Sequence, residues 1–222
     1  MHRFYSVLLL IISLTISVKS QSNATLGLLP SINISKKLPK DWSLHAKAET
    51  RLEVYSEEFD FEYQLTDLSL LAGRKVSLNT SLSAGYQIRF RQETISNRTI
   101  QQITYVKRYT GFRLSHRFAA DQTFQKQEYA EYRFRYRISS EFALQGQSVD
   151  PGEFFVKLNN EYLYSLQGQT DDLEIRLGAF GGYSINHGSK LELGMDYRTD
   201  SFIDNNIRHR MWIGINFYQT LQ

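Results

Sequence analysis

The sequence of 222 residues contains no cysteine and three prolines. Without cysteine the chain can form neither disulfides nor thiolate metal sites, and it cannot carry a lipid anchor on a cysteine. Beyond the first twenty residues, no apolar run approaches the roughly 20 residues that a membrane-spanning helix needs. If the remainder of the chain enters a membrane, it must therefore do so as β-strands.

The N-terminus has the layout of a secretory signal peptide. A basic start at 2–3 is followed by an apolar stretch at 4–18, and Val18-Lys19-Ser20 supplies small residues at the usual cleavage positions. The apolar stretch, about 15 residues, is too short for a spanning anchor. We therefore expect residues 1–20 to be a cleaved signal peptide and residues 21–222 to form one domain.

The chain also has little net charge once this segment is removed. Arg3 and Lys19 leave with it, so the 26 basic residues fall to 24 against 23 acidic residues, a net charge of +1. The sequence pI of about 9.0 is thus no sign of the strong basic excess that nucleic-acid-binding domains carry. We expect no nucleic-acid partner.

What the sequence does contain is a long alternation of apolar and polar side chains. In 42–54, 81–91 and 129–139 every second residue is apolar, with Thr50 as the exception, which is the pattern of a strand with two different faces. A helix is excluded, since a period of 3.6 would scatter the alternate arginines of 133–137 around its axis. The mean hydropathy of −0.40 does not argue against a membrane protein, because the two faces of barrel strands cancel in the mean.

Eleven segments have this strand character, and they recur along the whole domain. They are 26–37, 42–54, 65–75, 80–91, 100–109, 111–121, 128–139, 153–164, 172–183, 190–199 and 207–218. Apolar stripes of about 9–11 residues with aromatics near their ends favour an antiparallel transmembrane β-barrel over a soluble β-sandwich or a soluble lumen-binding barrel. Because bacterial single-chain barrels have even strand numbers, we expect about twelve strands, with ten as the alternative.

The connections are expected to differ between the two ends of the barrel. Short turns are predicted at 38–41, 76–79, 109–111 and 185–188. Longer polar loops are predicted at 55–64, 92–99, 122–127, 166–172 and 199–206. Short turns at one end and long loops at the other are typical of outer-membrane barrels. The link at about 140–152, which contains Asp150-Pro151-Gly152, is long for the short-turn end.

Two resemblances support this interpretation. The segment 206–218 resembles the last strand of outer-membrane barrels, which the barrel assembly machinery reads. The domain as a whole resembles an uncharacterised family of small outer-membrane β-barrels of Gram-negative bacteria, a domain of unknown function. The segments that carry the resemblance are Lys36–Trp42, Glu49–Arg51, Leu114–Phe118, Tyr132–Arg137, Asp150–Phe154 and Leu158–Glu161. It implies an outer-membrane location, with outer-membrane lipid, lipopolysaccharide and the assembly machinery as partners, and it supplies no cofactor, metal or catalytic residues.

Arginine predominates on the face that would line the lumen. The lumen-lining candidates are Arg51, Arg89, Arg91, Glu131, Arg133, Arg135, Arg137, Arg176 and Arg198. Arg–Glu networks can fill a small barrel and satisfy each other's hydrogen bonds, whereas rings of arginine can select small anionic solutes. Both interpretations stay open. The three arginines of 133–137 repel one another unless a neighbouring acid or a solute pairs with them.

We do not predict an enzyme. His187-Gly188-Ser189, with Glu192 nearby, has a spacing that a lipid hydrolase could use, but these residues are also common turn formers. The five histidines show no paired spacing typical of metal ligands. The predicted function is a porin-like channel or binding lumen for small anionic solutes, with a closed structural or surface-interaction barrel as the alternative.

Overall fold

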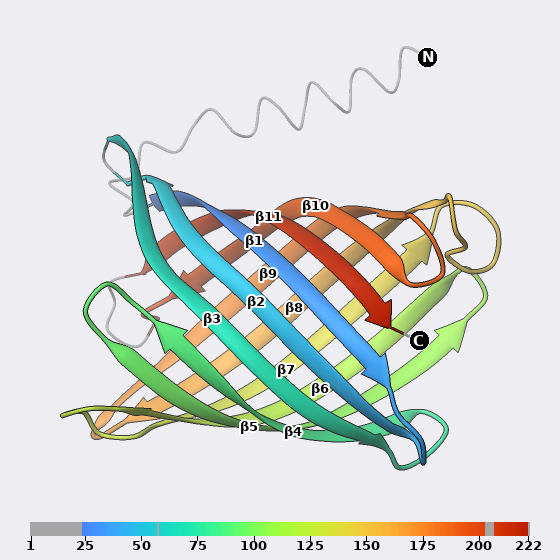
Figure 1. Cartoon of the computed structure of the whole chain (residues 1–222). Coiled ribbons are helices and arrows are strands. Elements are labelled where there is room, and N and C mark those ends of the chain that lie inside the picture. Colours follow the sequence, from blue (N-terminus) through green and yellow to red (C-terminus); the bar gives the residue numbers. More distant parts are fainter. Residues whose placement is uncertain (1–23, 57, 203–206, 222) are drawn as a thin grey trace.

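The computed structural model describes residues 24–56, 58–202 and 207–221, which form a closed barrel of eleven strands (Figure 1). The strands are β1 (Ala24–Lys37), β2 (Trp42–Tyr55), β3 (Phe59–Lys75), β4 (Thr80–Phe90), β5 (Ile95–Tyr109), β6 (Phe112–Gln125), β7 (Glu131–Ala143), β8 (Phe154–Gln167), β9 (Thr170–Ser184), β10 (Ser189–Asp200) and β11 (Arg208–Leu221). Among the described residues there is no helix long and apolar enough to cross a membrane. The expected signal peptide, residues 1–20, lies outside this part of the chain.

The barrel closes through a parallel pair of strands. Chain neighbours from β1 to β11 pair antiparallel, and β1 also pairs with β11 in parallel, from Ala24 opposite His209 to Lys36 opposite Leu221. The two strands lie side by side in Figure 1 and point the same way. An odd number of strands in an up-and-down barrel requires this parallel seam. The eleven strands correspond to the eleven segments identified in the sequence and lie close to the expected number of about twelve.

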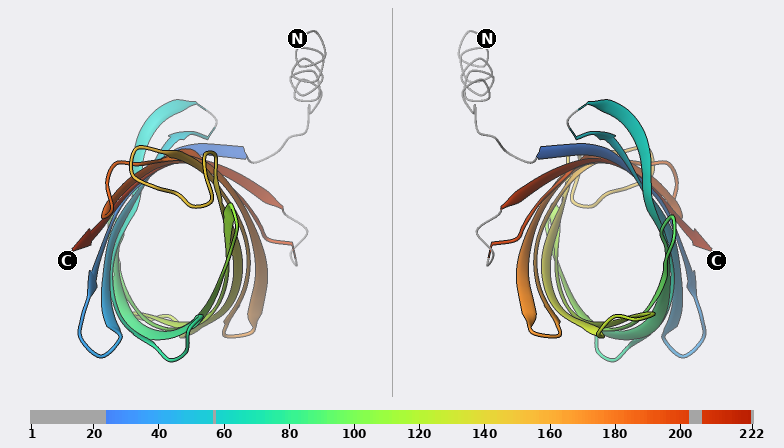
Figure 2. Two further views of the ribbon diagram at one scale, coloured as in Figure 1. Left: turned by 90° about the vertical axis from the view of Figure 1, so that its right-hand side faces the viewer. Right: turned by 90° about the vertical axis from the view of Figure 1, so that its left-hand side faces the viewer.

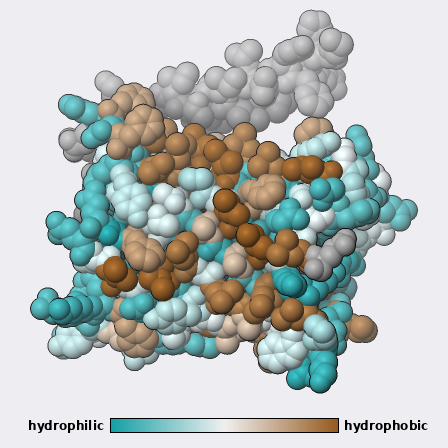
Figure 3. Space-filling view, in the orientation of Figure 1, coloured by the Kyte–Doolittle hydropathy of each residue, from teal (hydrophilic) through white to brown (hydrophobic). Residues whose placement is uncertain are grey.

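The alternation along each strand separates an apolar outer wall from a polar interior. Outer positions in the middle of the wall carry exposed side chains such as Leu68, Phe134 and Leu193. Figure 3 shows apolar side chains across the visible wall and hydrophilic ones gathered at its two ends. In the described strands, the charged residues at outer positions all lie within two residues of a strand end; they are Lys36, Arg74, Lys107 and Asp171.

Aromatic side chains gather near both ends of this wall. At one end Tyr109 stacks on Phe112, with ring centroids 4.5 Å apart, and Phe112 stacks on Phe142 at 5.7 Å. At the other end the Tyr197 hydroxyl lies 2.6 Å from His209 Nδ1, and the two rings stack. Such aromatic belts flank the apolar band of membrane barrels.

The connections differ from those expected. Most of 55–64 and of 92–99 is strand rather than loop, because β3 begins at Phe59 and β5 at Ile95. The ten-residue connection 144–153 lies at the end where short turns were predicted. The predicted division into a short-turn end and a long-loop end is therefore wrong. Viewed along its axis, the barrel has an oval cross-section (Figure 2).

Candidate functional site: an arginine-lined lumen

The barrel interior contains a cavity of about 630 Å³, lined by side chains from all eleven strands. Eleven lysines and arginines line it, against four acidic residues. The basic residues are Lys47, Arg51, Arg89, Arg98, Arg117, Arg133, Arg135, Arg137, Lys157, Arg176 and Arg198. Seven of the nine candidates from the sequence are thus brought together around one space.

Five arginines and one acid occupy a single row of directly paired positions on β6 to β11. In strand order the row is Arg117, Arg137, Glu161, Arg176, Arg198 and Arg210. Cβ atoms of directly opposed residues lie about 4.5–5.5 Å apart, so this register forces like charges together. Glu161 separates Arg137 from Arg176, while Arg198 and Arg210 pair with Asp196 and Asp200.

Glu161 pairs with three of these cations. Its side chain is 1% exposed, and its Oε2 accepts hydrogen bonds from Arg117 Nη2 at 3.2 Å and Arg137 Nε at 2.7 Å. Its Oε1 accepts a bond from Arg176 Nη1 at 3.1 Å. Arg176 is also held by Glu174, at 2.9 Å. Charge-assisted bonds of this kind are among the strongest in proteins.

Asp121 pairs with the remaining two inward arginines of β7. Its Oδ2 accepts a bond from Arg133 Nη2 and its Oδ1 one from Arg135 Nη2, each at 2.9 Å. The three alternate arginines of β7 are therefore paired with acids on both neighbouring strands. Asp121 was not among the sequence candidates, although it continues the inward alternation of β6 from Arg117.

Further ion pairs line the same cavity. Asp67 accepts two bonds from Arg89, from Nε and Nη2, both at 2.7 Å. Arg51 donates to Glu49 at 3.3 Å. Glu192 on β10 accepts bonds from Lys157 Nζ on β8, one strand away, at 2.9 and 3.0 Å. The interior is thus largely an ionic network, as the first interpretation of the sequence anticipated.

The acids nevertheless do not balance the bases. Four more acids pair with the eleven bases without lining the cavity themselves; they are Asp121, Glu131, Glu161 and Glu174. Eight acids then face eleven bases, which leaves three positive charges in excess. An electrostatic excess of this sign in a small cavity favours small anions.

Several buried donors around the cavity also have no acceptor among the described residues. They are Arg51 Nε, Gln87 Nε2, Arg133 Nε, Arg135 Nε and Arg198 Nη1. A buried donor without an acceptor costs about 1–3 kcal/mol. Because these atoms are fully buried, a solute in the cavity could bond to them only after the side chains had moved.

Two sequence candidates lie elsewhere. Glu131 begins β7 near one barrel end and lies 3.9 Å from Arg133 and 4.0 Å from Arg98. Arg91 is exposed in the turn at 91–94, so its assignment to the lumen is wrong. The reason is that β4 ends at Phe90, one residue before the alternation does.

Arg98 is a lumen residue that the sequence analysis missed, because the polar segment 92–99 was interpreted as a loop. Extending the alternation of β5 back from Ile100 would have found it. Arg98 Nε donates to Thr123 Oγ1 at 2.8 Å.

His187 and Gly188 lie in the turn between β9 and β10, and Ser189 begins β10. Asn186 Oδ1 accepts hydrogen bonds from the backbone N–H groups of Gly188 and Ser189, each at 2.8 Å. Ser189 Oγ donates to Gln219 Oε1 at 2.7 Å. The turn-former interpretation therefore describes the local structure.

Comparison with known proteins gives a family and a distant structural likeness. The family model described as "Protein of unknown function (DUF2490)" matches residues 10–214. None of the curated proteins compared with the chain matches it. Among solved structures, the siderophore receptor PirA from Pseudomonas aeruginosa is similar with a TM-score of 0.35 and 16% sequence identity. That match covers 79% of this chain and 35% of the receptor chain.

Proposed function

The chain belongs to the DUF2490 family of proteins of unknown function, and we propose from its geometry that it is an outer-membrane β-barrel whose lumen receives small anionic solutes. The observation that carries the proposal is the lumen lining, in which eleven bases surround one cavity with three charges in excess of all their paired acids. Rings of arginine are a recurring device for anion-selective pores.

The membrane location rests on the outer wall. Soluble monomers rarely expose apolar patches larger than a few hundred Å². Here exposed Leu, Ile, Phe and Tyr side chains occupy the wall of the described strands, and charged outer residues stay near strand ends. Together with the expected signal peptide, this wall supports the outer membrane of a Gram-negative bacterium as the setting. Outer-membrane lipid, lipopolysaccharide and the barrel assembly machinery are then the proposed partners.

The size of the cavity supports small solutes. Binding sites for small molecules typically measure about 300–1,000 Å³, and this cavity measures about 630 Å³. A solute with one or more carboxylate, phosphate or sulfate groups would accept charge-assisted bonds from the lysine and arginine side chains of the lining. Inorganic phosphate and sulfate are the simplest members of this class.

Planar-bilayer recording of the refolded chain tests the proposal. Under a salt gradient we expect conductance steps with a reversal potential that favours anions, and we expect Arg135→Gln to reduce this preference. Lys107→Gln removes one positive charge from the outer wall and is the matched control, which should leave the preference unchanged. Cation-selective or unselective steps would overturn the anionic lumen.

If the folded barrel shows no conductance steps, the lumen binds small anions but does not let them pass. In that case added phosphate or sulfate should raise the thermal stability of the wild type more than that of Arg135→Gln. Equal stability with and without these anions would refute the binding form of the proposal and favour a closed structural barrel.

A further inference from the structure

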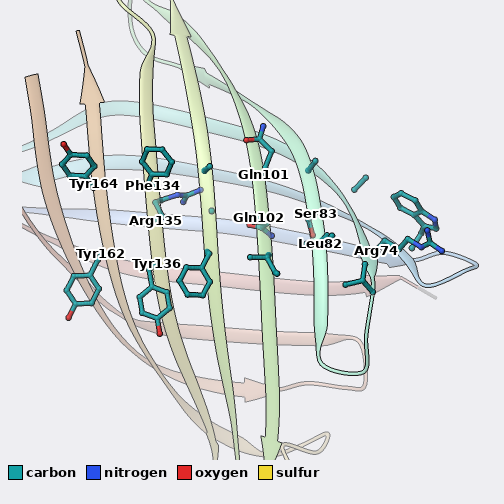
Figure 4. Close-up of a pocket in the computed structure, with 18 of the residues that line it drawn as sticks. Arg74, Leu82, Ser83, Gln101, Gln102, Phe134, Arg135, Tyr136, Tyr162 and Tyr164 are labelled. Atoms are coloured by element: carbon teal, nitrogen blue, oxygen red, sulfur yellow. The ribbon is translucent and has the colours of Figure 1, made fainter. Parts of the chain in front are cut away.

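The outer wall carries a groove of about 1030 Å³ (Figure 4). Its floor is a row of directly paired positions on β3 to β6, in the order Ala72, Ala84, Gln101 and Ala120. Alanine side chains lower the wall here, whereas the rows beside them carry larger groups. The groove is thus a consequence of small residues that share one row.

The rim of the groove is bulky and apolar. The neighbouring row contains Leu82, Ile103, Phe118 and Tyr136 in direct opposition, and the last two rings stack at 4.6 Å. Figure 4 shows Tyr162, Tyr136 and Arg74 along this row, with the arginine at the end away from the tyrosines. An extended apolar ligand would therefore contact side chains along its whole length.

The end of the groove near β2 and β3 is cationic. Arg74 is the penultimate residue of β3 and Trp42 the first residue of β2, and the Arg74 guanidinium lies 5.8 Å from the centroid of the Trp42 ring. No carboxylate pairs with Arg74 within the described part of the chain. Arg and Trp side chains at strand ends are typical of the level of lipid headgroups.

The polar residue in the floor is already satisfied. Gln101 and Gln122 exchange hydrogen bonds at 3.2 and 3.1 Å, and Thr99 Oγ1 donates to Gln122 Oε1 at 2.5 Å. A groove that needs no polar group from its occupant fits hydrocarbon better than it fits the backbone of a partner protein.

We propose that this groove binds an acyl chain of an anionic, phosphate-bearing membrane lipid, with the headgroup phosphate at Arg74. The inference rests on the membrane location proposed above and is independent of the role of the lumen. From β3 to β8 the groove crosses five strand spacings, about 24 Å at roughly 4.8 Å each. Because membrane strands tilt by about 35–45°, a row across them descends roughly 15 Å, about half of a 30 Å hydrocarbon core. The groove thus runs from the headgroup level to the depth that one leaflet's acyl chains reach.

Tryptophan fluorescence gives a direct test, because the chain has two tryptophans. Trp42 lines the groove, whereas Trp212 is 3% exposed inside the barrel. The full chain with Trp212→Phe is refolded into phosphatidylcholine vesicles that contain a small fraction of phosphatidylglycerol. One of the two lipids carries brominated acyl chains, which quench nearby tryptophan. Should Trp212→Phe fail to fold, the wild type serves, with the signal of Trp42→Phe subtracted as background.

We expect quenching by brominated phosphatidylglycerol to exceed that by an equal fraction of brominated phosphatidylcholine. The expected enrichment is about fivefold, the factor that one basic side chain contributes at an anionic lipid surface. Arg74→Gln should abolish it. The matched control is Lys107→Gln, because Lys107 is another outer cation near the same barrel end and lies over Tyr109 at 5.0 Å but does not line the groove. Ala84→Phe should reduce the enrichment by filling the floor.

Three results would overturn the proposal. The first is equal quenching by both lipids, and the second is an enrichment that survives Arg74→Gln. The third result comes from a second reporter, a tryptophan at Leu193 on the outer face of β10 (Leu193→Trp) in a chain that lacks both natural tryptophans. If this reporter is quenched and Trp42 is not, a protein surface covers the groove. If neither is quenched by any lipid, the wall is not in the bilayer and the membrane proposal itself fails.

Discussion

Replacement of Glu161 by glutamine isolates the charge balance of the lumen. The substitution keeps the size of the side chain and removes one negative charge from the centre of three arginines, Arg117, Arg137 and Arg176. Arg176 retains Glu174 at 2.9 Å, but the other two have no second carboxylate within 4 Å among the described residues. We therefore expect Glu161→Gln to destabilise the barrel.

The expected loss is about 3 kcal/mol. Removing one member of a buried ion pair costs about 3–5 kcal/mol, because the partner charge stays buried and uncompensated. Arg117 and Arg137 are 29% and 30% exposed to the cavity, which lets solvent screen part of this cost and places the loss at the lower end. The matched control is Glu141→Gln, since Glu141 is 11% exposed and its partners Arg113 and Lys190 are 44% and 31% exposed. It should cost at most about 1 kcal/mol.

Urea unfolding of the chain refolded in detergent micelles measures both variants. A loss of about 3 kcal/mol lowers the midpoint by roughly 1 M or more at the slopes typical of small proteins. Adding Arg137→Gln to Glu161→Gln should cost less than the sum of the single changes, because it removes one of the stranded charges. Sulfate should also restore more stability to Glu161→Gln than to the wild type, since an anion can replace the missing carboxylate. A loss no larger than that of Glu141→Gln would refute the role assigned to Glu161.

Further predictions concern the packing and closure of the barrel. Gly182→Ala should cost about 1–3 kcal/mol in the same unfolding assay, because a Cβ there would lie 2.1 Å from the ring of Phe155; Gly181→Ala, where the nearest atom is 4.0 Å away, should be neutral. If both substitutions cost the same, the assignment of the inner face is wrong. The cysteine-free chain also allows a direct test of the parallel seam, because the pair Leu28→Cys and Ile213→Cys should form a disulfide on mild oxidation, seen as a mobility shift that reductant reverses. No disulfide in the folded chain would contradict the parallel register.

The two faces of the strands were predictable, because alternation is a local property of the sequence. Arg133, Arg135 and Arg137 lie in the interior for that reason, as does Arg176 on another strand. Strand ends were harder to place. At the start of β5 the residues 96–99 are polar on both faces, so the alternation stops while the hydrogen-bonded ladder continues. At the start of β3 the alternation is present at 59–63 but changes phase at Gln64, which the ladder with β2 skips. Both strands therefore begin several residues before their predicted starts.

The ion pairs of the lumen could not be derived in the same way. Glu161 becomes the centre of three arginines because β8 aligns it with Arg137 on one side and Arg176 on the other. A register shift of one residue would turn its side chain to the outer wall, and a shift of two would separate it from both arginines. Register follows from turn geometry and packing along the whole sheet. The sequence can therefore name the charges in the lumen but not the acid that each arginine meets.

The strand number is a still less local property, and it has a consequence for the proposed membrane setting. Closure joins residues as far apart in the sequence as Ser31 and Asn216, whose side chains hydrogen-bond at 2.7 Å across the seam. In a barrel with an even number of strands the first and last strands are antiparallel, so the start of the first and the end of the last lie at the same end. With eleven strands β1 and β11 run in the same direction, and Ala24 and Leu221 lie at opposite ends of the barrel (Figure 1). In a membrane these two positions would face opposite compartments, a topology that strand alternation alone does not reveal.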